Sequence, residues 1–246
     1  MTNLILQDCG AARRLVYYLA MEEYAAEHFD DAFFIWQVDP TVIFGRNQDM
    51  NAEVDVTYCM EHGIQMYRRK SGGGCVFADR GNIMISYIRR CSDVSQLFNE
   101  YLERLSSFLH SLGLNSEVSG RNDVLVDGRK VSGNAFSLKP NGVGIVHGTL
   151  LYNLDFHTMS SAITPSRAKL SSKGVHSVQQ RVLNLKPLLD ERNMGLDELE
   201  SSIISYFCTD CLTLTAEQEN EISKIEQGYL DPSFIKGHIG HSDDSL

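Results

Sequence analysis

The sequence predicts one α+β domain, in which a mixed, largely antiparallel sheet is flanked by helices. Three observations predict this class: several short β-rich runs, two Asp-Gly or Asn-Gly pairs between such runs, and longer amphipathic segments that separate them. The composition agrees, because 43% of the 246 residues are hydrophobic and 22% are charged. No repeat or linker-like tract divides the chain, so we expect a single domain over residues 1–246.

The first elements are predicted as a helix followed by strands. Residues 10–28 have the apolar spacing of an amphipathic helix. Two β-rich runs follow, FFIWQV from Phe33 and TVIFG from Thr41, with the break Asp39-Pro40 between them. This pattern is typical of two strands joined by a turn, and a second helix is predicted over residues 56–62.

The middle of the chain predicts most of the sheet. The runs QMYRRK, CVFAD and NIMISYIRR have the composition of strands, and a glycine triplet at 72–74 links the first two. Residues 92–112 form the longest periodic segment and predict a helix with Ser92 as its N-cap. Asp127-Gly128 and Asn141-Gly142 predict two turns between strands.

The last third is predicted to be helical, over residues 155–162, 196–207 and 216–227, and to end in a polar tail. Six cysteines without the spacing of a disulfide framework are expected to be reduced thiols. The pair Cys208 and Cys211 has no second CxxC, so we interpret it as two small residues at a helix end rather than as a redox pair or half a zinc site.

Charge and hydropathy exclude several classes of function. The net charge of −10 argues against a broad nucleic-acid surface, since phosphate backbones bind cationic faces. The N-terminus lacks the basic region and long apolar run of a signal peptide, and no stretch approaches the roughly 20 apolar residues that span a bilayer. We therefore expect a cytoplasmic protein whose anion sites, if present, are local.

The common nucleotide and catalytic motifs are absent. The sequence has no GxxxxGK[ST], no GxGxxG after its first strand, and no HExxH, GxSxG or kinase set. Any nucleotide chemistry must therefore use another scaffold.

Four glycine-containing stretches instead place polar residues at predicted strand ends. They begin at Gly45, Arg68, Gly120 and Gly128, and the stretch HGT from His147 follows them. Together they indicate one cationic, glycine-lined cleft on an acidic protein. Such a cleft suits an enzyme that activates a carboxylic acid with ATP, because cations and backbone N–H groups must offset two approaching negative charges. A lysine that contacts both partners can also align them.

These stretches resemble the lipoate-protein ligase A family. RRKSGGGCVFADRGN, SGRNDVLVDGRKVSGNAF, HGTLLYNLD and KLSSKGVHSVQQRVLNL occur in the family's order, from about Gly45 to Leu185. The resemblance implies the α+β catalytic domain of the biotin and lipoate protein ligase superfamily. It also implies that ATP and a divalent metal such as Mg²⁺ convert lipoate to lipoyl-AMP. The expected acceptors are lysines on lipoyl domains of 2-oxoacid dehydrogenase E2 subunits and on the glycine-cleavage H protein.

The resemblance also implies roles for particular residues. Lys130 corresponds to the family's catalytic lysine, which touches both the lipoyl carboxyl oxygen and the phosphate. The implied ATP and lipoyl-AMP contacts are Arg69, Gly74, Cys75, Val76, Phe77, Asn122, Asp123 and Lys130. The implied lipoate contacts are Ser71, Gly72, Gly73, Lys130 and His147. The metal ligands are unknown, with Asp123 as a candidate.

The chain departs from the family pattern in three ways. Ala78 stands where a histidine is usual, and Cys75 replaces an alanine, which we interpret as a packing substitution rather than a nucleophile. The sequence stops at Leu246, so we expect no C-terminal accessory domain and consider a separate accessory subunit as one arrangement.

Two other functions fit the same fold. An octanoyltransferase or lipoyl amidotransferase would move an acyl group through a cysteine without ATP, but Gly144 occupies the position where one branch has that cysteine. A non-catalytic lipoate-binding protein would be favoured by loss of the lysine, which is present. Biotin ligase is disfavoured because its GRGRxG-type loop is missing. A docking patch for the acceptor domain is hypothesised at Arg167, Lys169, Lys173 and Arg181.

Overall fold

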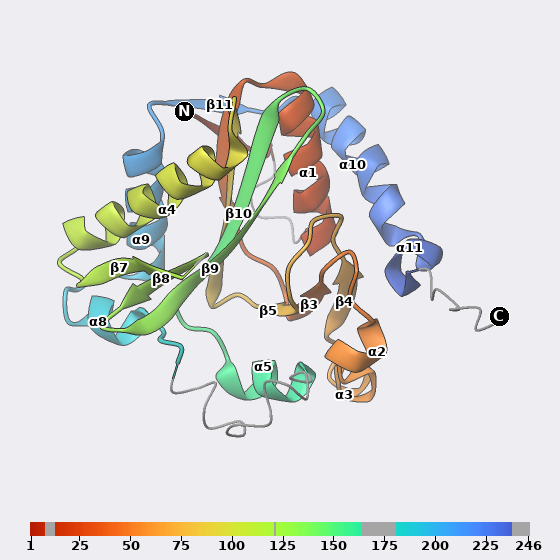
Figure 1. Ribbon diagram of the computed structural model, residues 1–246, viewed down its shortest axis with the longest axis horizontal. Helices are drawn as coiled ribbons and strands as arrows, with labels where there is room; N and C mark the ends of the chain where they lie inside the picture. The colour runs from red at the N-terminus through yellow and green to blue at the C-terminus, as the bar shows by residue number, and fades with distance from the viewer. Residues whose placement is uncertain (8–12, 121, 164–180, 238–246) are drawn as a thin grey trace, which may run out of the picture.

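The computed structural model describes residues 1–7, 13–120, 122–163 and 181–237, which contain one large and one small sheet (Figure 1). The large sheet has eight strands, in spatial order β11 (Asp210–Thr213), β1 (Thr2–Ile5), β2 (Asp31–Trp36), β6 (Asn82–Arg90), β10 (Val143–Leu151), β9 (Arg129–Leu138), β8 (Asp123–Val126) and β7 (Ser116–Ser119). β1 pairs in parallel with β11 and β2, and the other pairs are antiparallel. This confirms the predicted mixed, largely antiparallel sheet.

The small sheet places the glycine triplet beside the large one. Its order is β4 (Gln65–Arg68), β3 (Thr41–Phe44), β5 (Val76–Ala78), with β3 parallel to β4 and antiparallel to β5. The chain from Arg69 to Cys75, which we call the glycine loop, connects β4 to β5. The short helices α2 (Met50–Glu53), α3 (Val56–Glu61) and α5 (Phe156–Ala162) lie at this end of the molecule (Figure 1).

Helices cover both faces of the large sheet. On one face, α4 (Val94–Ser111) and α9 (Leu196–Phe207) pack in a core that includes Phe33 and Tyr87. On the other face, α1 (Leu15–His28) and α10 (Ala216–Leu230) pack in a core that includes Phe34 and Trp36. Neighbouring residues of β2 thus enter opposite cores, as the two-residue period of a strand requires.

The helix starts differ slightly from the predictions. α1 begins at Leu15 with Arg14 as N-cap. The prediction of a helix from residue 10 is therefore wrong for residues 13–14, and residues 10–12 lie outside the described residues. α4 is capped by Asp93 rather than Ser92, because its carboxylate accepts hydrogen bonds from the amides of Ser95 and Gln96. The apolar stripe of α4 is buried as predicted.

Both predicted turns are confirmed. Asp127 and Gly128, with φ of 49° and 72°, are left-handed, as a two-residue turn between β8 and β9 requires. Gly142, with φ of 80°, turns the chain from β9 to β10.

Several short elements are not among the predicted ones. The strands β1, β7 and β11 have four residues each, too few for a two-residue period to stand out. The helices α8 (Lys186–Asp190) and α11 (Pro232–Lys236) are one turn long, and α11 occupies part of the predicted polar tail. Cys208 caps the end of α9 as expected, and Cys211 lies in β11. None of the described helices has the length and hydropathy needed to cross a bilayer.

Candidate active site

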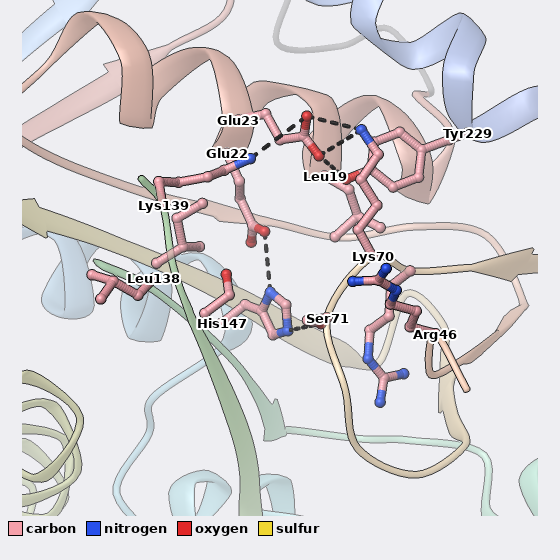
Figure 2. Close-up of a pocket in the computed structure, with 13 residues that line it drawn as sticks. Leu19, Glu22, Glu23, Arg46, Lys70, Ser71, Leu138, Lys139, His147 and Tyr229 are labelled. Atoms are coloured by element: carbon pink, nitrogen blue, oxygen red, sulfur yellow. Dashed lines mark hydrogen bonds and ion pairs between the residues drawn. The ribbon is translucent and has the colours of Figure 1, made fainter. Parts of the chain in front are cut away.

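A cavity of about 480 Å³ lies where β6, β9 and β10 meet the glycine loop. Most of the predicted site residues line it: Arg69, Gly73, Gly74, Cys75, Val76, Phe77, Asn122, Lys130 and His147. Ser71 lines a second, adjoining hollow of about 250 Å³, which Arg69 and His147 share (Figure 2). Asp123 forms an ion pair with Lys130 of the cavity wall, and the carbonyl of Gly72 accepts a hydrogen bond from Arg69. The structure therefore brings together segments that are far apart in sequence.

The sheet register orders the cavity along the strands. His147, Thr149 and Leu151 of β10 pair with Ser86, Met84 and Asn82 of β6, respectively. Residues two apart in a strand, and residues directly paired across it, share one face of the sheet. These three pairs therefore form successive levels, and we refer to them as the His147, Thr149 and Leu151 levels.

The side chain of Lys130 reaches along β9 to the Thr149 level. Its ammonium is 2.7 Å from a carboxylate oxygen of Asp123, and both side chains are about one-third exposed. A Cβ on Gly133, which pairs with Thr149, would come within 2.6 Å of the Lys130 Nζ, so the missing side chain leaves room for the ammonium. The site thus holds a positive charge midway along the cavity.

The backbone of Lys130 is fixed from both sides. The register between β8 and β9 shifts at Leu125, which pairs with Lys130, so a bulge re-aims this part of β9. On the other side, the Lys130 amide donates to the carbonyl of Arg181 at 2.7 Å, and its carbonyl accepts from the Leu183 amide at 2.8 Å. This pairing with residues 181–183 gives no local sequence signal.

Asn122 is tied to β9. Its side-chain amide donates to the carbonyl of Asn134 at 2.9 Å, and the Asn134 side-chain amide donates to the carbonyl of Asn122 at 3.0 Å. The reciprocal bonds hold the start of β8, and with it Asp123, beside Lys130. The predicted contact of Asn122 with a nucleotide stays a prediction.

Arg69 organises the glycine loop. Arg69 is 5% exposed, and its guanidinium donates to the carbonyls of Gly72 at 2.8 and 3.0 Å, Gly74 at 2.6 Å and Ile43 at 3.3 Å. Burial lowers the pKa of Arg69 to about 10, so it stays protonated at neutral pH. The sequence predicts that Arg69 faces phosphates, whereas in this structure it binds the loop that would cover them.

Two glycines explain how the loop folds back. Gly73 has φ of 95°, a left-handed conformation that other residues rarely adopt. A Cβ on Gly45 would lie 2.2 Å from the Gly73 carbonyl oxygen, so only glycine there lets the loop approach the end of β3. The Arg46 amide then donates to the Ser71 carbonyl at 3.0 Å. Gly72 and Gly74, in contrast, have open space beside them.

Sequence reasoning missed Glu22, which lies on α1 at the His147 level. Its buried carboxylate accepts from the Ser86 hydroxyl at 2.6 Å. It also lies 3.1 Å from His147 Nδ1 (Figure 2). The other ring nitrogen of His147 is 3.2 Å from the Ser71 hydroxyl. This chain of contacts fixes the imidazole between the helix and the glycine loop. The available signal was an acidic residue within an apolar helical pattern.

A second acidic residue of α1 gathers cations at the adjoining hollow. Glu23 accepts from the Tyr229 hydroxyl at 2.5 Å and from Lys70 at 2.9 Å, with Lys139 at 3.7 Å (Figure 2). Burial opposes ionisation of Glu23, but the bonds from Tyr229 and Lys70 outweigh it and lower its pKa. The cluster ties the glycine loop to α1, to α10 and to Lys139, the residue after β9.

The cavity offers no activated thiol among the described residues. Cys75 is the cysteine that lines it, and burial raises the pKa of its thiol to about 12. A Cβ on Gly144 would lie 2.5 Å from the Leu97 Cδ2, so a cysteine there would require the Leu97 side chain to move. Ala78 is fully buried in the core under α1. These findings agree with reading Cys75 as a packing residue.

Asp123, the predicted metal candidate, is a single carboxylate beside the Lys130 ammonium. Among the described residues, no three His, Cys, Asp or Glu side chains gather as a complete set of metal ligands. Mg²⁺ commonly binds one or two carboxylates together with substrate phosphates and water, so a single carboxylate beside a phosphate site fits it. Of the predicted docking patch, only Arg181, which is exposed, lies within the described residues.

Comparisons with known proteins agree with this geometry. The family model described as "Lipoyl protein ligase A/B catalytic domain" matches residues 15–208. A lipoate-protein ligase of Bacillus subtilis is 38% identical over 193 residues, which cover 76% of this chain and 57% of the relative. A probable lipoate-protein ligase A of Mycoplasma pneumoniae is 33% identical, and the match covers 88% of this chain and 62% of that relative.

Solved structures show the same fold. The bipartite lipoate protein ligase of Thermoplasma acidophilum superposes with a TM-score of 0.84 over 96% of both chains at 24% identity. A lipoate-protein ligase A bound with ATP superposes with a TM-score of 0.79 at 23% identity, and the match covers 96% of this chain and 98% of that structure's chain. The chain spans less than two-thirds of the length of the curated relatives above. The match of the family model over most of the chain shows that the protein belongs to the lipoyl protein ligase A/B catalytic domain family.

Proposed function

We propose that this domain is the catalytic part of an ATP-dependent lipoate-protein ligase, which makes lipoyl-AMP and transfers the lipoyl group to a lysine of a carrier domain. The observation that carries the proposal is the placement of the Lys130 ammonium midway along a continuous cavity. Leu19, Trp36 and Ile43 are among the apolar side chains that line that cavity, as binding of an eight-carbon acyl chain requires. The names of the curated relatives, and a neighbour solved with ATP, support it.

In the first step, a lipoate carboxylate oxygen attacks the α-phosphorus of ATP, and pyrophosphate leaves with the electrons of the broken P–O bond. Lys130 offsets the two like charges that must approach, and the glycine loop covers the reacting groups. Asp123 would hold Mg²⁺ together with phosphate oxygens, and the ion would neutralise further charge.

In the second step, the acceptor lysine amine attacks the carbonyl carbon of lipoyl-AMP. The carbon–oxygen bond to AMP breaks, AMP leaves with those electrons, and the amine loses a proton as the amide forms. Lys130, near the same carbonyl oxygen, would stabilise the negative charge that develops there. We propose that the acceptors are lipoyl domains of dehydrogenase E2 subunits or the H protein, and that the reactions take place in the cytoplasm.

An acyl transferase that works through a cysteine is the rival on the same fold. It needs a thiolate at the cavity, but the Cys75 thiol has its pKa raised to about 12 by burial, and position 144 is a glycine. The described part of the site therefore favours activation by ATP over thioester exchange.

The deciding experiment is the intact mass of an apo lipoyl domain after incubation with the protein, lipoate, Mg²⁺ and ATP. A parallel reaction contains octanoyl carrier protein in place of lipoate and ATP. Lipoyl addition only with ATP supports the ligase, and octanoyl addition without ATP supports the transferase. Lipoyl-AMP formation without addition would indicate that transfer needs a separate accessory chain, and no product in either reaction would favour a binding protein.

Cys75→Ala is expected to retain nearly full lipoyl transfer. The thiol is protonated at neutral pH, and alanine removes one heavy atom from a partly exposed position beside the cavity. The measurement is kcat/KM for lipoylation with ATP. A loss of about 10³-fold, the size expected when a covalent nucleophile is removed, would contradict the ligase mechanism.

A further inference from the structure

The second half of strand β9 has an open edge. β8 pairs with β9 as far as Gly133, and the Asn134 amide then donates to the carbonyl of Asn122 at 3.0 Å. Within the described part of the chain, nothing pairs with β9 on this side after Asn134, whereas β10 continues on the other side to Leu138. Backbone hydrogen-bonding groups along this edge are therefore available to a further strand.

The outward-pointing groups belong to Phe136 and Leu138. The Lys139 amide donates to the Val143 carbonyl at 2.9 Å, so Lys139, and Ser137 two residues before it, bond inward to the neighbouring strand. The amides and carbonyls of Phe136 and Leu138 then point away from β10. Their side chains are apolar and are 39% and 52% exposed. Proteins usually protect an open edge with charge, proline or a covering segment, so an exposed apolar edge indicates a pairing surface.

This edge borders the adjoining hollow of about 250 Å³ beside the active site. Ser137 and Leu138 point to opposite faces of β9, as neighbours in a strand do, yet both line the hollow. The hollow therefore extends to the edge of the strand. A strand added along this edge would continue the line of β8, which begins at Asp123, the ion-pair partner of Lys130. A partner bound here would thus end beside the reacting groups.

The hollow is cationic on an acidic protein. Four cationic side chains of the described chain line it: Arg46, Arg69, Lys70 and Lys139 (Figure 2). Glu23 lies 2.9 Å from Lys70 and 3.7 Å from Lys139, so one carboxylate faces two ammonium groups, and the other lining carboxylate, that of Glu22, is buried. The Arg46 guanidinium is exposed and has no partner among the described residues. This excess of positive charge favours an acidic partner.

We propose that the open edge of β9 binds an extended acidic segment of the carrier domain as an additional strand. Backbone bonds to Phe136 and Leu138 would supply affinity, and carboxylates entering the hollow would meet its cations. A second copy of this chain fits less well, because pairing two β9 edges would bring two cationic hollows together. The inference rests on the proposed function, since it says where the protein substrate of the second step docks.

The direct test measures hydrogen exchange at the Phe136 and Leu138 amides of the wild-type protein. A saturating apo lipoyl domain is expected to slow exchange at both amides by 10-fold or more, roughly the effect of a newly formed backbone hydrogen bond. A lipoyl domain whose target lysine is changed to arginine should protect them equally. Unchanged exchange at saturation overturns the inference. Protection that appears without carrier, when the protein's own concentration is raised, shows that the edge joins two copies and also overturns it.

Leu138→Pro removes one outward amide and leaves the bonds to β10 intact, because proline is tolerated where the N–H faces solvent. The KM for the apo lipoyl domain is expected to rise about 10-fold, the loss of one backbone bond and a blocked edge, while lipoate-dependent pyrophosphate release stays within about twofold of wild type. Leu138→Ala keeps the amide and is the matched control, with a rise of about threefold or less. An equal rise in both variants would contradict pairing through the backbone.

Arg46→Ala tests the contribution of charge. The KM for the apo lipoyl domain is expected to rise about fivefold at low salt and by less as the ionic strength increases. Arg129→Ala, at an exposed cation that does not line the hollow, should stay within about twofold. A protein that releases no pyrophosphate with lipoate refutes the proposed function. One that activates and transfers lipoate, but keeps the wild-type carrier KM in both Leu138→Pro and Arg46→Ala, refutes the docking edge alone.

Discussion

Lys130→Ala is expected to abolish lipoyl-AMP formation while the domain stays folded. Removing one oxyanion-hole donor typically costs about 10²- to 10³-fold in rate. Lys130 would act on both reactants, so we expect a loss at the upper end of this range or beyond. Its ion pair with Asp123 is about one-third exposed, which makes a small contribution to stability. The measurements are lipoate-dependent pyrophosphate release and the melting temperature.

Arg129 provides the control for the loss of positive charge. It precedes Lys130 on β9, is exposed, and does not line the cavity. Arg129→Ala should keep both pyrophosphate release and stability within about twofold of wild type, as for most surface substitutions. Near-normal activation of lipoate by Lys130→Ala would show that the catalytic residue has been assigned wrongly.

The sequence predicted the parts of the site that depend on local chemistry. The turn at Asp127 and Gly128 follows from residues that tolerate a left-handed backbone, and it sets Lys130 near the start of the returning strand. The glycine triplet likewise marked a loop that closes on the cavity, although only Gly73 within it adopts a positive φ. Motif resemblance then connected these segments, which share no local signal.

The features that the sequence did not reveal depend on distant contacts. Glu22 interrupts the apolar pattern of its helix in the sequence, but only the packing of α1 over His147 shows what it contacts. The side-chain amide of Asn82 has no hydrogen-bond partner among the described residues, which becomes apparent only once β6 is buried. The pairing of Lys130 with residues 181–183 joins segments about fifty residues apart, and no periodicity encodes such pairing.

Arg69→Lys is expected to weaken both lipoate and ATP use by about 100-fold in kcat/KM. The guanidinium makes four hydrogen bonds to three carbonyls that hold the glycine loop, and one ammonium cannot reproduce them. Losing one or two hydrogen bonds to a charged group corresponds to a free-energy loss of about 1.5 to 3 kcal/mol each. Kinetics with lipoate and ATP varied separately measure the effect, and Arg80→Lys, at an exposed ion pair with Asp39, serves as control.

Two explanations of the importance of Arg69 then make different predictions. If Arg69 acts mainly by holding the loop, the lysine variant should raise the KM of both substrates and speed hydrogen exchange at the Gly72–Gly74 amides. If Arg69 instead leaves the carbonyls to contact phosphate, only the KM for ATP should rise, and exchange in the free protein should stay as in wild type. Because its donors bind the loop before any substrate arrives, we expect the first result, and a selective effect on ATP would contradict it.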